Sequence, residues 1–218
     1  MSKNTPKVKP LSAKSDGQKD YIRSIAENQI TICHGLAGTG KTYIPVTMAL
    51  DWLYRTDKPI EKIVLVRPIV EVGGGMGFYP GTKEEKATEY LIPIIDQIEG
   101  HVGKAEYNKL VKDGVIQLTP LPLMRGLNWH NSFIIADEMQ SATYNQLVCL
   151  LTRFGRDSRM VINGDVKQTD LHLQNGERCP LMHVIDRIRG IAEIGFVELS
   201  YEDIVRSDLI GSIIQALN

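Results

Sequence analysis

Apolar residues along this chain fall in short runs rich in valine and isoleucine, separated by longer stretches with apolar residues three or four positions apart. The short runs are typical of buried strands, and the longer stretches are typical of amphipathic helices. Strands are expected at residues 29–33, 60–66, 115–118, 132–136, 159–163 and 195–199. Helices are expected at residues 17–28, 43–54, 83–98, 104–112, 141–151, 180–191 and toward 217. The alternation predicts one α/β domain, with a mostly parallel sheet of about five buried strands and helices on both faces.

Composition and charge limit the partners and the compartment. The 218 residues carry a formal net charge of −1, so a nucleic-acid partner would bind a local patch or a pore. The three scattered cysteines, Cys33, Cys149 and Cys179, predict reduced thiols rather than a disulfide framework. No apolar run is long enough to span a membrane and no signal peptide opens the sequence, so we expect a cytoplasmic protein with no membrane partner.

The first fifteen residues differ in composition from the rest. They carry four lysines and no acidic residue, which predicts a flexible basic tail over residues 1–15. A basic arm that touches nucleic acid is the alternative. Residues 16–218 are expected to form the single domain.

One glycine-rich stretch between an expected strand and an expected helix carries the strongest chemical signal. It fits the phosphate-binding pattern G-x-x-x-x-G-K-[ST] and consists of Gly35, Leu36, Ala37, Gly38, Thr39, Gly40, Lys41 and Thr42. Glycines allow several backbone N–H groups to face one anion. Lys41 would contact the terminal phosphates and the Thr42 hydroxyl would bind Mg²⁺, so the pattern predicts a P-loop site for ATP and Mg²⁺.

Two acidic residues follow the expected strand at residues 132–136. Asp137 would lie across from Thr42 and bind Mg²⁺ through water. Glu138 would polarise an attacking water as a general base. Kinase-type P-loop enzymes usually lack the second acid, so the pair favours hydrolysis.

Other strand ends and loops supply further candidates. Gln168 follows the strand at residues 159–163 and is expected to contact the γ-phosphate and sense its loss. Arg67 ends the second strand and would face either the ligand or solvent. The glycine-rich loop at 72–82 holds Phe78 and Tyr79, which suit stacking on unpaired bases, a lid or a subunit contact.

The order of these features resembles the nucleotide-binding core of superfamily 1 helicases and, in more detail, the PhoH-like ATPase family. The likeness covers about residue 17 to the end. It is carried by the Gln-Lys-x-Tyr-Ile pattern around Gln18, Gly-Phe-x-Pro-Gly at 77–81, Asp-Glu-Met-Gln at 137–140, Gly-Asp through Asp-Leu at 164–171 and Asp-Ile-Val-Arg at 203–206. Pro45 and Ser207 depart from the family pattern.

The resemblance implies an ATPase with a RecA-like sheet, hexameric assembly and an association with RNA, often as a helicase. By this resemblance, Gln18 would contact adenine, and Lys41 and Thr42 would bind the phosphates and the metal. Asp137 would bind the metal and Glu138 the attacking water. We therefore expect a single RecA-like P-loop NTPase domain that acts on single-stranded nucleic acid, with RNA favoured.

Superfamily 1 motors place ATP between two RecA-like domains, whereas this chain has room for one. An arginine finger contributes about 10³–10⁵ in rate, so a neighbouring subunit in a head-to-tail ring is expected to complete the site. Arg206 and Arg125 are the candidates for the γ-phosphate contact. A small-molecule P-loop NTPase or kinase and an ATP-gated ring scaffold for a protein partner remain as alternatives.

Overall fold

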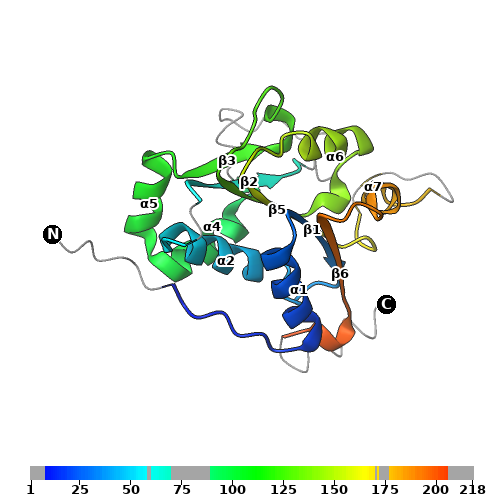
Figure 1. Ribbon diagram of the computed structural model, residues 1–218, viewed down its shortest axis with the longest axis horizontal. Helices are drawn as coiled ribbons and strands as arrows, with labels where there is room; N and C mark the ends of the chain where they lie inside the picture. Colours follow the sequence, from blue (N-terminus) through cyan, green and yellow to red (C-terminus); the bar gives the residue numbers. More distant parts are fainter. Residues whose placement is uncertain (1–7, 58–59, 70–88, 170, 172–176, 206–218) are drawn as a thin grey trace.

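A six-stranded sheet in the order β3-β2-β4-β5-β1-β6 forms the centre of the computed structural model (Figure 1). The structure describes residues 8–57, 60–69, 89–169, 171 and 177–205. All the paired strands run parallel. The strands are β1 (Ile30–Gly35), β2 (Lys62–Arg67), β3 (Ile116–Pro120), β4 (Ser132–Ala136), β5 (Arg159–Gly164) and β6 (Ile194–Leu199). The predicted α/β domain with a mostly parallel sheet is confirmed, with one strand more than the estimate of about five buried strands.

Helices cover both faces of this sheet, as predicted. One core lies under α1 (Asp16–Glu27), α2 (Tyr43–Tyr54), α4 (Ile92–Val102) and α5 (Lys104–Lys112). The other core lies under α6 (Tyr144–Leu151), α7 (Pro180–Ile188) and the short 3₁₀ helices η1 (Leu121–Leu123) and η2 (Met139–Ser141). Successive residues of a strand enter opposite cores: Leu65 joins the first and Val66 the second. Both faces are buried, which explains the continuous apolar runs in the sequence.

One predicted helix is interrupted and another begins later than expected. In the described part of the helix expected at 83–98, a turn at residues 90–91 precedes α4, which begins at Ile92 with Pro93 in its first turn. Residues 83–88 of that prediction lie outside the described residues. The helix expected at 141–151 begins at Tyr144, because Thr143 caps it and forms a capping box with Gln146. The loop at 72–82 and the helix expected toward residue 217 lie outside the described residues.

Residues 8–15 run along the domain ahead of α1 (Figure 1). Val8 and Leu11 are partly buried and pack against the first core. This packing differs from the flexible tail expected over 1–15, because the two apolar side chains give the segment surface to bury. Residues 1–7 lie outside the described part.

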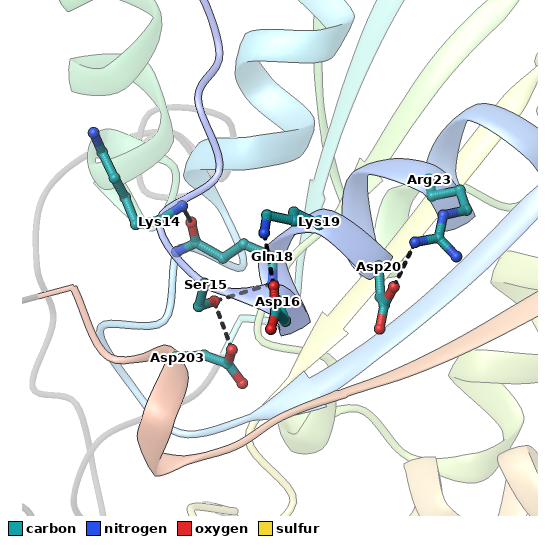
Figure 2. Close-up of polar contacts among 8 residues, drawn as sticks. All are labelled: Lys14, Ser15, Asp16, Gln18, Lys19, Asp20, Arg23 and Asp203. Carbon is teal, nitrogen blue, oxygen red and sulfur yellow. Dashed lines mark hydrogen bonds and ion pairs between the residues drawn. The ribbon is translucent and has the colours of Figure 1, made fainter.

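Figure 2 shows how the start of α1 is tied to the end of the described chain. Ser15 caps α1 and its hydroxyl donates to Asp203 Oδ1 at 2.6 Å. Asp203 belongs to the 3₁₀ helix η3 (Tyr201–Asp203) and also accepts from the Ser200 N–H at 2.7 Å. These bonds hold α1 beside the carboxyl end of β6, next to the glycine-rich loop.

The helices that the structure describes include none long and apolar enough to cross a membrane.

Candidate functional site

The glycine-rich loop joins β1 to α2 at the carboxyl edge of the sheet, in the strand, loop and helix order that the motif requires. Gly35 has φ +153°, and a Cβ there would clash with the Leu199 carbonyl oxygen, so only glycine fits. Pro45 lies in the first turn of α2, where a missing N–H leaves no helical bond unmade. The helix dipole favours an anion at the loop.

Three carbonyl groups of the loop are held by other parts of the chain. Gln18 Nε2 donates to the Thr39 carbonyl at 2.9 Å and the Tyr21 hydroxyl donates to the Lys41 carbonyl at 3.1 Å. The Val205 N–H donates to the Gly38 carbonyl at 3.0 Å. Gln18 and Tyr21 stand three positions apart on one face of α1, so a single helix holds two of the three carbonyls.

Lys41 is the cation of the loop. Its ammonium donates to the Gly35 and Leu36 carbonyl groups, both at 2.6 Å. Burial lowers the pKa of this ammonium, and the nearby Asp165 carboxylate opposes that effect. A phosphate oxygen would offer the ammonium a charged acceptor, which forms a stronger bond than a neutral carbonyl.

Asp137 and Thr42 form the oxygen pair expected for a divalent cation. The Thr42 hydroxyl donates to Asp137 Oδ1 at 3.0 Å. Asp137 is buried, and this burial raises the pKa of its carboxyl group. A hard cation would stabilise the charged form, and oxygen donors are the ligands that Mg²⁺ prefers. Within the described residues no group of three or more His, Cys, Asp or Glu could hold a metal alone, so water and phosphate oxygens would complete the coordination.

Glu138 follows β4 with φ +56° and ψ +35°, a left-handed conformation that costs a non-glycine residue about 1–3 kcal/mol. Its carboxylate lies 3.3 Å from Arg67 and accepts a 2.7 Å hydrogen bond from Gln140. Arg67 also donates to the Tyr90 carbonyl at 2.7 Å. Arg67 was expected to face either a ligand or solvent. In the structure it instead pairs with Glu138, the predicted base.

A cavity of about 710 Å³ brings most of the predicted residues together. This volume is within the range of small-molecule sites. Asp165 and residues 9–12 and 14, which we did not assign to the site from sequence, also face the cavity. The predicted residues that line it are Gln18, Ala37, Gly38, Gly40, Lys41, Thr42, Asp137, Glu138 and Gln168.

Gln18, expected to read adenine, already uses both ends of its amide. The nitrogen donates to Thr39, and the oxygen accepts from the Lys14 N–H at 2.8 Å (Figure 2). Only 5 % of the residue is exposed. Its adenine contact stays a prediction, and the observed role of the side chain is to join residues 9–14 to the glycine-rich loop.

Of the two predicted arginines, Arg125 lies in the described part of the chain and is not among the described residues that line the cavity. Arg125 is exposed beyond η1. Arg206 lies outside the described residues, although its neighbour Val205 lines the cavity. Their roles therefore remain predictions.

A buried polar network beneath the loop was missed in the sequence. The Tyr21 hydroxyl shares its single proton between the Lys41 carbonyl and Asn163 Oδ1, which lies 2.6 Å away, and Asn163 Nδ2 donates to the Lys41 carbonyl at 2.7 Å. Neither residue is measurably exposed. The sequence did hold one indication of this network, an asparagine at the end of an otherwise apolar strand. A buried amide requires hydrogen-bond partners, so such an asparagine predicts a polar network.

Replacing Tyr21 with phenylalanine is expected to lower the free energy of unfolding by about 1–3 kcal/mol, because the buried Asn163 oxygen loses its donor. Urea unfolding measures this change, with Tyr43→Phe on the exposed Tyr43 as the control. Equal stability of Tyr21→Phe and the unmodified protein would contradict the assigned network.

Comparisons with known proteins agree with this architecture. The large terminase of bacteriophage HK97 aligns with a TM-score of 0.54 at 12 % identity, over 89 % of this chain and 41 % of the terminase. A large terminase from a thermophilic bacteriophage aligns with a TM-score of 0.53 at 10 % identity, over 96 % of this chain and 51 % of that terminase. At these identities the likeness concerns the fold alone, and it confirms the predicted RecA-like P-loop architecture.

Relatives in sequence carry one family name. A PhoH-like protein of Bacillus subtilis is 38 % identical over 216 residues, covering 99 % of this chain and 66 % of the relative. Protein PhoH of Escherichia coli K12 is 30 % identical over 211 residues, covering 96 % and 58 %. This chain thus spans about three fifths of the length of these curated relatives. The family model described as PhoH-like protein matches residues 10–218, and the chain therefore belongs to the PhoH-like family.

Proposed function

We propose that this protein binds ATP with Mg²⁺ and hydrolyses it, as an oligomeric, helicase-like motor on single-stranded nucleic acid, with RNA favoured. One observation carries the hydrolytic part. Lys41, Asp137 and Glu138 come from two separate segments and face one cavity at the carboxyl edge of the sheet. A phosphate-binding cation, a metal-binding carboxylate and a second carboxylate in one cavity are the groups that ATP hydrolysis requires.

Each residue then has a defined task. Lys41 binds the β- and γ-phosphates, and Thr42 with Asp137 holds Mg²⁺. The metal, when bound, neutralises the phosphate charge. Glu138 accepts a proton from the attacking water, and Gln168 contacts the γ-phosphate from the loop after β5. Gln18 lies close enough to the cavity for the base of the nucleotide.

The oligomeric part of the proposal concerns the arginine that would contact the γ-phosphate. Among the described residues the cations that line the cavity are all lysines: Lys9, Lys14 and Lys41. The charge that develops on the γ-phosphate would therefore be stabilised by Arg206, or by Arg125 of a neighbouring subunit in a head-to-tail ring. A hexameric ring is the proposed assembly, in a cytoplasmic setting that suits the three free cysteines.

Steady-state ATP hydrolysis against protein concentration, with and without single-stranded RNA or DNA, tests this proposal. We expect the rate per subunit to rise with concentration, because subunits complete one another's sites, and to rise again with oligonucleotide. If the protein is monomeric and hydrolyses ATP at full rate, with a rate per subunit that does not change with concentration, the ring is ruled out. Phosphorylated product in place of free phosphate would indicate a kinase, and hydrolysis indifferent to nucleic acid would indicate a small-molecule NTPase or a scaffold.

A further inference from the structure

Gln140 lies between the proposed general base and the segment that follows β5. Its Nε2 donates to Glu138 Oε2 at 2.7 Å, and its Oε1 accepts from the Asp165 N–H at 3.0 Å. Only 4 % of Gln140 is exposed. Both polar atoms of one buried amide are therefore used, one by Glu138 and one by Asp165, and both of these residues line the cavity.

The backbone of Gln140 strengthens the link to the same segment. Its carbonyl accepts from the Thr169 hydroxyl at 2.9 Å and from Cys179 Sγ at 3.7 Å. Thr169 directly follows Gln168, the proposed contact to the γ-phosphate. The turn after β4 and the segment 164–169 are thus joined at both ends of that segment, at Asp165 and at Thr169.

Close approach at this point depends on Gly164. A Cβ at position 164 would lie 3.1 Å from the Gln140 nitrogen, 3.2 Å from its Oε1 and 2.7 Å from Leu181 Cδ2. A larger residue would push β5 away from the turn that carries Gln140. The contact is therefore built into the packing of β5 against η2.

The carboxylate of Glu138 has two donors and a constrained backbone. Arg67 faces Oε1 from β2, and Gln140 bonds Oε2 from the turn that Glu138 itself begins. The Glu138 side chain is 44 % exposed, so packing alone does not fix it. The two donors are the contacts that orient the carboxylate.

We propose that Gln140 is a positioning residue that orients Glu138 and ties it to the segment 164–169, so that a phosphate contact at Gln168 and the orientation of the base change together. This inference rests on the proposed ATPase function. Glutamine suits the task because its amide supplies a donor toward a carboxylate and an acceptor toward a backbone N–H at the same time.

Two substitutions separate the two bonds. Gln140→Glu keeps an acceptor for the Asp165 N–H but loses the donor to Glu138, whereas Gln140→Met keeps the length and loses both bonds. We expect each to lower kcat for ATP about 10-fold or more, since mispositioned catalytic groups lose rate steeply. KM should stay within about threefold, because the glycine-rich loop is untouched. Gln117→Glu and Gln117→Met on strand β3 are the matched controls.

A double-mutant cycle distinguishes positioning from a general structural effect. Where Gln140 acts through Glu138, Gln140→Met should lower kcat in the unmodified protein and cause no further loss in a Glu138→Gln background. Equal losses in both backgrounds, or a folded Gln140→Glu protein with an unchanged kcat, would overturn the proposal.

A failure of the proposed function is visible separately. If the unmodified protein hydrolyses no ATP, the same double-mutant cycle is measured from the midpoints of urea unfolding. Non-additive shifts for Gln140→Met and Glu138→Gln would support the positioning contact even then, and additive shifts would refute it.

Discussion

Replacing Lys41 with alanine is expected to abolish ATP hydrolysis and to weaken ATP binding about 10²-fold. The ammonium is the one loop cation that lines the cavity, and losing a hydrogen bond to a charged group costs about 1.5–3 kcal/mol. The variant loses the Lys41 bonds to the Gly35 and Leu36 carbonyl groups, but the carbonyl groups at Gly38, Thr39 and Lys41 stay held by donors from elsewhere in the chain.

Titration with a fluorescent ATP analogue and a phosphate-release assay measure this effect. Lys109→Ala is the matched control, because Lys109 is an exposed lysine on α5 that pairs with Glu106. Binding and turnover by Lys41→Ala at the level of the control would exclude the glycine-rich loop as the phosphate site.

Glu138→Gln is expected to retain ATP binding while kcat falls about 10²–10⁴-fold, the usual contribution of a general base. The amide keeps the size of the side chain and an oxygen that accepts from Arg67, but it cannot take a proton from water. Single-turnover hydrolysis and nucleotide titration, measured together, separate the chemical step from binding.

Glu61→Gln makes the same exchange on an exposed glutamate that precedes β2 and bonds Asn131, so it is the control for this variant. Hydrolysis by Glu138→Gln near the rate of the control would remove Glu138 from the role of base and would leave the attacking water to another group.

Most strands of the sheet could be predicted from the sequence, because burial on both faces requires a continuous run of apolar residues. The inner strands β1, β2, β4 and β5 are buried at most positions, so their apolar runs stood out in the sequence, whereas the edge strands β3 and β6 are only partly buried. Helix starts were less readable. The beginning of α6 depends on one capping interaction, and the Thr143 and Gln146 pair that marks it was present but was overlooked.

The parts of the candidate site that are formed by residues close together in the sequence could be predicted. The glycine-rich loop and the acidic pair after β4 each need specific residue types at fixed spacing, and they lie at the cavity. Arg67 shows the limit of this reasoning. A position at a strand end placed it near the site, but its pairing with Glu138 depends on β2 lying beside β4.

Sequence spacing alone therefore determined the α/β alternation and located the glycine-rich loop and the two acids, because each is a local pattern. Tertiary structure decided which distant groups meet. Tyr21 reaches Asn163 across 142 positions, and Gln140 reaches Asp165 across 25. Such contacts follow from the order β4-β5-β1 and the packing of α1 on the sheet. Buried amides and hydroxyls find their partners only after the strands are paired, since no local pattern specifies a donor so far along the chain.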